Sequence, residues 1–235
     1  MSVFRFKQFD VKQANNPLKV GTDSMLLGAF INVIDKKHGL DLGTGTGVLS
    51  LMVAQKNTEI LLDAIEINKV AAEECAFNFQ NSPWKNRLDT IEGDYLKFQF
   101  DKSYDLIFSN PPYHLEEVYG RDKAETLAKH SDSKDLTKLI QLASKLLTFD
   151  GDFWLILPFQ LLNYIQEITL KNQLFCKELI RIHAKESKPN TRIILCFTKR
   201  KTDLLQCDFY IRKENNSYSQ AYIELTKKFH FIDLS

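Results

Sequence analysis

Runs of apolar residues alternate along the chain with segments in which apolar residues recur every three or four positions. The runs are typical of strands buried on both faces, and the three-to-four-residue spacing is typical of helices packed on a sheet. We expect strands at residues 40–42, 60–67, 88–91, 105–109 and 153–157. We expect helices at residues 23–33, 48–54, 69–79, 136–147 and 159–170. This alternation predicts an α/β fold with a parallel, doubly wound sheet.

The pattern changes after Pro158. Residues 179–184 and 193–197 are two β-rich segments joined by a polar turn, which predicts an antiparallel hairpin that finishes the sheet. Beyond Thr202 the chain is hydrophilic, with a candidate strand at residues 208–212 and a candidate helix at residues 220–227. We expect a single domain, in which an N-terminal segment and helix (1–38) and a C-terminal extension (201–235) flank the core (39–200).

The composition indicates where the protein is located and what kinds of partner it can bind, but it does not indicate the reaction. The 235 residues are 44% hydrophobic and 26% charged with a formal net charge of +1, so a polyanionic partner needs a local basic surface. The four cysteines are far apart and suggest buried, reduced thiols and no metal site. Residues 1–10 alternate polar and apolar positions, unlike a signal peptide, and no apolar stretch has the length of a membrane span. We expect a cytoplasmic monomer without a membrane partner.

A glycine turn, DLGTGTG at residues 41–47, lies between the first buried strand and the following helix. Glycines let the backbone turn sharply and approach a ligand closely enough for direct N–H contacts. We therefore expect cofactor contacts from five residues, Asp41, Gly43, Thr44, Gly45 and Gly47. The turn alone also fits a nicotinamide enzyme or a purely structural loop.

Two carboxylates past the turn favour S-adenosylmethionine as the cofactor. Glu66 ends the second strand, where an acidic residue accepts hydrogen bonds from ribose hydroxyls, or is a surface carboxylate at a strand end. Asp94 follows the third strand and either contacts the ligand or forms a turn with Gly93. Together with Asp41 these groups suit the cationic amine and sulfonium of adenosylmethionine and would repel a pyrophosphate.

The most specific feature is the tetrapeptide Asn110, Pro111, Pro112 and Tyr113, which directly follows a buried strand. An exocyclic planar nitrogen is a poor nucleophile, and catalysis needs acceptors that hold its N–H groups. Asn110 offers a side-chain carbonyl, Pro111 a main-chain carbonyl, and Tyr113 a flat face for stacking a base. The alternative is a strand that ends in a proline turn.

In the order and type of these motifs, the chain resembles the class I methyltransferases that carry an NPPY signature. The segments FRFKQF at 4–9, KVGTD at 19–23, MLLGA at 25–29 and NSPW at 81–84 extend the resemblance to the bacterial tRNA1(Val) (adenine-37)-N6-methyltransferases over nearly the whole length. The resemblance implies methyl transfer to adenine N6 beside a tRNA anticodon, on a Rossmann-like, seven-stranded sheet with a C-terminal antiparallel hairpin. It also implies that Val20 to Asp23, with Thr22 among them, form the wall around the methionine end of the cofactor.

Basic residues gather at 121–129, 185–192 and 199–201, segments that follow or flank the loops expected at the carboxyl edge or the hairpin. Such a rim could follow the phosphates of tRNA, although any single lysine also fits an ordinary solvated surface. Our candidate substrate contacts are His114, Arg121, Lys129 and Arg192. His114 is assigned to the substrate loop and not to base catalysis, because the proton of a methylated amine is acidic enough to leave to water.

Three other functions remain compatible with these motifs. A protein glutamine methyltransferase of the release-factor type would use the same loop on an amide, but such enzymes carry an added N-terminal domain, for which about 40 residues before the glycine turn leave no room. A guanine-N2 methyltransferase of ribosomal RNA uses related loops. A binding module for adenosylmethionine or RNA would keep the fold without turnover.

Overall fold

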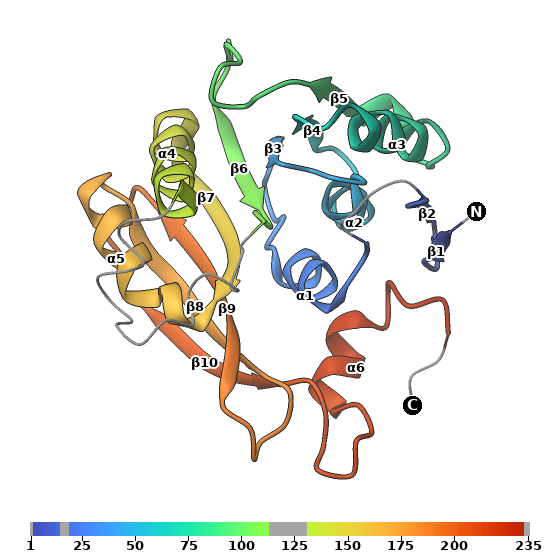
Figure 1. Ribbon diagram of the computed structural model, residues 1–235, viewed down its shortest axis with the longest axis vertical. Coiled ribbons are helices and arrows are strands. Elements are labelled where there is room, and N and C mark those ends of the chain that lie inside the picture. The colour runs from blue at the N-terminus through green and yellow to red at the C-terminus, as the bar shows by residue number, and fades with distance from the viewer. Residues whose placement is uncertain (1, 15–18, 113–130, 233–235) are drawn as a thin grey trace.

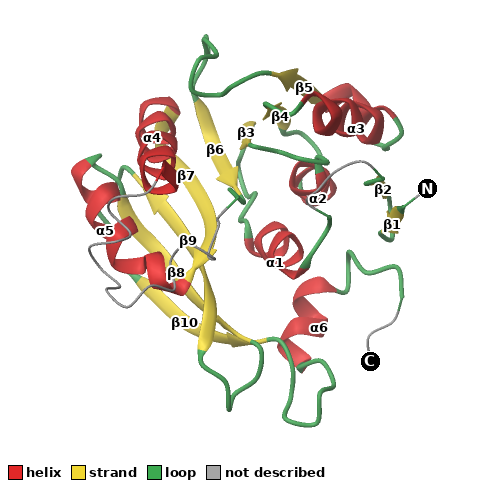
Figure 2. Ribbon diagram, in the orientation of Figure 1, coloured by secondary structure: helices red, strands yellow, loops and turns green. Residues whose placement is uncertain are grey.

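The computed structural model describes residues 2–14, 19–112 and 131–232. A central sheet with helices on both faces organises these residues (Figures 1 and 2). The strands are β1 (Val3–Arg5), β2 (Asp10–Lys12), β3 (His38–Leu42), β4 (Leu61–Glu66), β5 (Leu88–Glu92), β6 (Tyr104–Ser109), β7 (Leu147–Pro158), β8 (Phe175–His183), β9 (Asn190–Thr198) and β10 (Leu205–Tyr210). The helices are α1 (Thr22–Phe30), α2 (Val48–Lys56), α3 (Lys69–Gln80), α4 (Ser131–Leu146), α5 (Leu162–Lys171) and α6 (Gln220–Thr226).

The sheet has eight strands in the order β10-β8-β9-β7-β6-β3-β4-β5. The five strands from β5 to β7 are parallel, and β9 runs antiparallel between β7 and β8. The α/β fold class and the antiparallel hairpin are thereby confirmed, but the expected count of seven strands is wrong. The eighth strand, β10, pairs in parallel with β8 at the edge. Its first four residues are exposed, so it lacks the apolar run by which buried strands are recognised.

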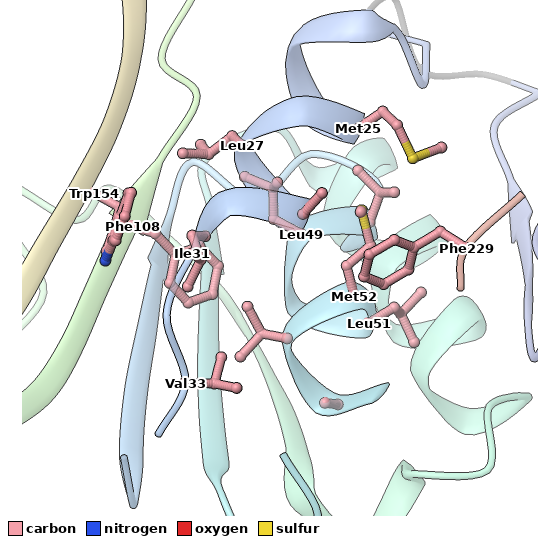
Figure 3. Packing of buried hydrophobic residues seen from close by; sticks show 14 of the residues in the cluster. Met25, Leu27, Ile31, Val33, Leu49, Leu51, Met52, Phe108, Trp154 and Phe229 are labelled. Atoms are coloured by element: carbon pink, nitrogen blue, oxygen red, sulfur yellow. The ribbon is translucent and has the colours of Figure 1, made fainter. Parts of the chain in front are cut away.

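Successive side chains of the inner strands point to opposite faces, and both faces are apolar. Along β7, Phe153 and Leu155 pack with α4 and α5, whereas Trp154 and Ile156 pack with α1 and α2. This two-sided burial explains the continuous apolar runs in the sequence. In α2 every residue from 48 to 54 is buried, because the helix packs against α1 as well as against the sheet (Figure 3).

The N-terminal segment forms a small antiparallel hairpin of β1 and β2 that packs on α3 (Figure 1). The sequence pattern predicted no strands here. The rings of Phe6 and Phe9 stack at 4.3 Å between centroids, and Trp84 meets Phe9 edge-on at 5.5 Å. The hairpin is therefore held by aromatic packing against residues more than 70 positions away along the chain.

The expectation of four buried cysteines is correct for two of them. Cys75 and Cys196 are buried, Cys176 is half-buried and Cys207 is exposed. Burial raises the pKa of the Cys75 thiol, which keeps it protonated. Cys207 is exposed because it lies on β10, the edge strand with one uncovered face. No helix in the described ranges has the length and apolar character needed to cross a bilayer.

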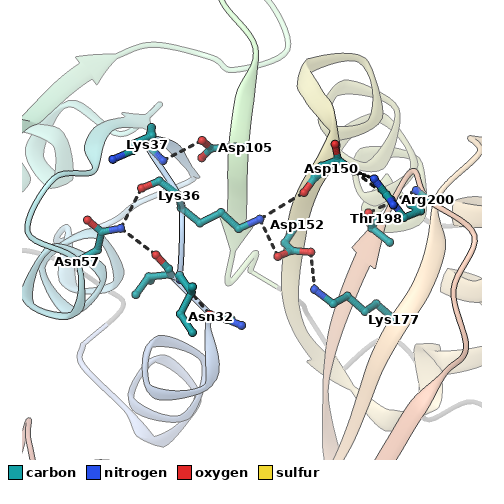
Figure 4. A network of polar contacts seen from close by, with 12 residues as sticks. Asn32, Lys36, Lys37, Asn57, Asp105, Asp150, Asp152, Lys177, Thr198 and Arg200 are labelled. Atoms are coloured by element: carbon teal, nitrogen blue, oxygen red, sulfur yellow. Dashed lines mark hydrogen bonds and ion pairs between the residues drawn. The ribbon is translucent and has the colours of Figure 1, made fainter.

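A buried network of ion pairs joins the start of β3 to β7 and β8 (Figure 4). Lys36, just before β3, reaches Asp152 on β7 at 2.8 Å, and Lys177 on β8 binds the other oxygen of Asp152 at 3.1 Å. The side chains of Lys36 and Asp152 are 9% and 6% exposed. This pairing explains how a lysine is accommodated at the entrance of a central strand.

Replacing Asp152 is expected to destabilise the fold strongly. Asp152→Ala leaves Lys36 buried without its carboxylate, a change that costs about 3–5 kcal/mol of unfolding free energy. Asp150→Ala is the matched control, because Asp150 pairs with Arg200 on the surface, where an ion pair contributes about 0–1 kcal/mol. Urea denaturation measures both. Similar small losses in the two variants would contradict a structural role for the Lys36–Asp152 pair.

Candidate active site

The glycine turn connects the carboxyl end of β3 to α2 and is bound to β4. The N–H groups of Gly43 and Thr44 both donate to the Ile65 carbonyl, at 2.9 and 3.1 Å. Gly43 and Gly47 have φ angles of +73° and +82°. A Cβ on Gly43 would meet nothing within 4 Å, whereas one on Gly47 would lie 2.5 Å from the Phe79 ring. Gly43 thus leaves open space for a ligand, and Gly47 allows α2 and α3 to approach closely.

Asp41 lies beneath the turn and is fully buried. Its Oδ2 accepts hydrogen bonds from the hydroxyls of Thr44 at 2.6 Å and Ser50 at 2.8 Å. Its Oδ1 has no hydrogen-bond partner in the part of the chain that the structure describes. Burial raises the pKa of Asp41 to about 7, and the two hydroxyls oppose this shift. The carboxyl group therefore braces the turn without a neighbouring cation among the described residues.

Glu66, at the carboxyl end of β4, is bonded to the same turn. One carboxylate oxygen accepts from the Gly45 N–H at 2.9 Å, and the other accepts from the Asn68 N–H at 2.8 Å. Each carboxylate oxygen has about two acceptor positions, so each retains one for a ligand hydroxyl. The ribose contact of Glu66 stays a prediction. Through its hydrogen bond with the Gly45 N–H, Glu66 also positions the glycine turn.

Asp94 lies just beyond β5, one strand farther along the same edge. Its Oδ1 accepts from the Leu96 N–H at 2.9 Å, and Lys97 pairs with its other oxygen at 3.4 Å. Asp94 therefore forms a turn, which was the alternative to ligand contact. Its side chain is 24% exposed, and its role toward a cofactor stays a prediction.

A cleft of about 540 Å³ opens beside the glycine turn. Three segments line it: residues 19–24 at the start of α1, residues 43–46 of the turn with the start of α2, and residues 110–112 after β6. Thr22, Gly43, Thr44 and Gly45 thus face the same cleft as Asn110, although the chain separates Thr22 from Asn110 by almost 90 residues. The sequence-based placement of both motifs at the carboxyl edge of the sheet is confirmed.

Two side chains that the sequence analysis did not single out position the walls of the cleft. The Ser109 hydroxyl donates to the Leu42 carbonyl at 2.6 Å, which fixes the start of the Asn110 loop beside the glycine turn. The Gln13 side chain accepts from the Val20 N–H at 2.7 Å and holds the wall before α1. The Ser109 bond joins residues 67 positions apart, so no local pattern could have indicated it, whereas the Gln13 bond spans only seven positions.

Ile67 directly follows Glu66, the residue that ends β4, and its side chain is 66% exposed. The apolar run at residues 60–67 predicted Ile67 as the last residue of a buried strand, but β4 ends at Glu66. Its exposed position beside Glu66 makes Ile67 a further candidate for ligand contact, which the apolar run did not indicate.

Of the residues predicted to contact the substrate, Arg192 lies within the described part of the chain. Tyr113, His114, Arg121 and Lys129 lie outside the described residues. Arg192, at the start of β9, donates from Nε to Asp23 Oδ2 at 2.9 Å, and Asp23 lines the cleft. The RNA contact proposed for Arg192 stays a prediction, and its ion pair places it next to the cleft wall.

Residues 199–201, one of the three predicted basic segments, lie at the amino ends of the parallel strands, opposite to the cleft. β9 is antiparallel to β7, with Arg192 opposite Pro158 and Phe197 opposite Phe153. Residues 199–201 therefore follow β9 at the amino edge, on the side away from the cleft. There Lys199 donates to the Leu147 carbonyl and Arg200 pairs with Asp150. The strand direction corrects the expectation that residues 199–201 border the substrate.

Comparisons with known proteins agree with this geometry. Residues 14–175 match the family model described as methyltransferase small domain. The chain is 35% identical to the tRNA1(Val) (adenine(37)-N6)-methyltransferase of Photorhabdus laumondii, covering 97% of this chain and 94% of that protein. It is 34% identical to the protein of the same name from Pedobacter heparinus, covering 97% of both. Its fold is similar to that of a predicted O-methyltransferase from Agrobacterium tumefaciens, with a TM-score of 0.67, 17% identity, and coverage of 88% of this chain and 96% of that chain.

Asp41→Asn is expected to remove a pH dependence of stability. Burial raises the pKa of Asp41 to about 7 in the folded protein, whereas an unfolded aspartate has a pKa of about 3.9. The folded state binds this proton more tightly, so the stabilisation is complete below about pH 4 and is lost as the pH rises to about 7. Relative to Asp41→Asn, the cofactor-free wild type should lose about 1 kcal/mol of unfolding free energy per pH unit between pH 5 and 7. A pH-independent difference in urea unfolding would refute the raised pKa.

Proposed function

Because the chain belongs to the family of tRNA1(Val) (adenine(37)-N6)-methyltransferases, we propose that it transfers a methyl group from S-adenosylmethionine to N6 of adenine-37 in tRNA1(Val). The observation that carries the chemistry is the cleft in which Asn110, Pro111 and Pro112 lie across from the glycine turn. Family membership favours adenine over a protein glutamine or a guanine. We place the reaction in the cytoplasm.

The residues at the carboxyl edge fit adenosylmethionine. Gly43 leaves open space at the turn, and Glu66 retains acceptor positions for two ribose hydroxyls. Ile67 would cover the adenine ring, and Asp94 would accept from its amine. Asp41 and Glu66 supply negative charge close to the cofactor's cationic amine and sulfonium. Thr22 belongs to the wall around the methionine end.

The Asn110 loop prepares the target nitrogen. The Asn110 side-chain carbonyl and the Pro111 main-chain carbonyl accept the two N–H hydrogens of the adenine amine, so its lone pair is directed at the methyl carbon. When bound, adenosylmethionine supplies an electrophilic methyl group on a positively charged sulfur. As the N–C bond forms, the S–C bond would break and leave a neutral thioether, and the extra proton on the nitrogen leaves to water. Ser109 keeps the two acceptors aimed through its bond to Leu42.

The reaction is tested on tRNA from a strain that lacks this protein. Nucleoside mass spectrometry should show the loss of one N6-methyladenosine, at position 37 of tRNA1(Val), and the purified chain with adenosylmethionine should restore it. Asn110→Ala should lower this transfer at least about 100-fold, because one acceptor for the reacting amine is missing. Calorimetry should show nearly unchanged cofactor binding by that variant. Near-wild-type transfer by Asn110→Ala would refute the mechanism, and unchanged tRNA nucleosides in the deletion strain would refute the substrate.

Glu66→Ala should instead weaken cofactor binding by about tenfold or more, since hydrogen bonds to a charged group are lost. Glu92→Ala is the matched control. Glu92 ends β5 directly beside Glu66 in the ladder, but it is exposed. Calorimetry with adenosylmethionine measures both affinities. Equal affinity of the Glu66→Ala variant and the wild type would refute the ribose assignment.

A further inference from the structure

A second cavity, of about 580 Å³, lies between the two ends of the chain and α3. We call it the N-terminal pocket. It is lined by residues 3, 5–10 and 12 of the hairpin, by Phe77 and Asn78 of α3, by Asn81 directly after α3, and by Phe231. The C-terminal segment joins the hairpin through the Lys7 N–H, which donates to the Phe229 carbonyl at 2.9 Å, and through a bridge between Phe6 and His230. Figure 1 shows the hairpin beside α3.

The pocket is locally basic. Arg5, Lys7 and Lys12 line it, against the single carboxylate of Asp10. The chain as a whole has 31 basic and 30 acidic residues, so this excess is a local feature. Arg5 is exposed and lies opposite Asp10 in the β1–β2 ladder, and it forms no ion pair with a described residue. Such a cluster is suited to a phosphate-bearing ligand.

Exposed aromatic rings lie among these cations. Phe77 is 49% exposed and Phe231 is 58% exposed. The Lys12 ammonium lies 4.7 Å from the centre of the Phe77 ring. An exposed ring with adjacent cations is the combination by which proteins hold single-stranded nucleic acid, with the base stacked and the phosphate paired.

Asn78 connects the wall of the N-terminal pocket to the wall of the cleft. Asn78 lines the pocket, and its amide donates to the carbonyl of Thr46, which lines the cleft, at 2.9 Å. Asn78 also exchanges two hydrogen bonds with the backbone of Lys12, at 2.8 and 3.0 Å. The next residue, Gln13, binds Val20 in the cleft wall. A strand with one base in the cleft therefore has a second binding position within reach.

We propose that the N-terminal pocket holds a nucleotide of the same tRNA that flanks the methylated adenine, with its base on Phe77 and its phosphate between Arg5 and Lys12. This inference rests on the proposed function, because the ligand is the RNA substrate itself. The pocket strengthens the binding of tRNA and takes no part in methyl transfer.

The test measures the affinity of the full-length protein for unmodified tRNA and its methylation kinetics. Phe77→Ala should weaken tRNA binding at least about fivefold, the value of one stacked base. Arg5→Gln should lower the slope of log affinity against log salt by about 0.7–0.9, as one phosphate contact is lost. Both variants should raise KM for tRNA and leave kcat at saturating tRNA and the affinity for adenosylmethionine unchanged.

Phe149→Ala and Arg200→Gln are the matched controls. Phe149 is 61% exposed with Arg200 at 5.8 Å from its ring centre, but this pair lies at the amino edge of the sheet. Neither control should alter tRNA binding. If the wild type methylates tRNA and both Phe77→Ala and Arg5→Gln bind it normally, the pocket proposal is overturned while the proposed function stands. A wild type that neither binds nor methylates tRNA overturns both.

Discussion

The position of β3 in the sheet is the constraint on which the cleft depends. From β3 the chain first builds β4 and β5 on one side, and then returns to its other side as β6. The loops that follow β3 and β6 therefore diverge at the carboxyl edge and leave a crevice between them. Two hydrogen bonds attach the starts of these loops to neighbouring strands, one from Ser109 to Leu42 across β6 and β3, and one from Gly43 to Ile65 across β3 and β4. The glycine turn and the loop of residues 110–112 are each specified by their own short sequence. They form one site only because β3 and β6 are neighbours in the sheet.

Buried charged groups have different partners at the amino ends and at the carboxyl ends of the parallel strands. At the amino edge, Lys36 and Lys177 neutralise Asp152, and Lys102 pairs with Asp63 at 2.8 Å. At the carboxyl edge, Asp41 and Glu66 accept hydrogen bonds only from neutral hydroxyl and N–H donors in the described part of the chain. A buried carboxylate without a cation is costly, which is why burial raises the pKa of Asp41. The amino ends thus hold buried charges in ion pairs, whereas the carboxyl ends leave their carboxylates without a cation among the described residues.

The sequence predicted those features whose signal is local. The buried runs, the helical spacing, the glycine turn and the Asn110 loop each specify their own conformation, and the fold class followed from their order. β10 was predicted only in part, as a candidate strand at residues 208–212, because the exposed residues at its start carry no apolar run. The hairpin of β1 and β2, the Lys36–Asp152 pair and the Ser109 bond depend on contacts between distant segments. Their partners are fixed by strand register, which one sequence does not reveal.

The direction of β9 decides where a polyanion can lie. Because β9 runs against β7, Arg192 at its start is beside the cleft, and the basic residues after its end are at the opposite edge. From the sequence alone, the basic segments 185–192 and 199–201 are equivalent, because the sequence shows their charge but not the direction of β9. The cations that remain near the cleft then come from two sides, the turn between β8 and β9 and the N-terminal hairpin.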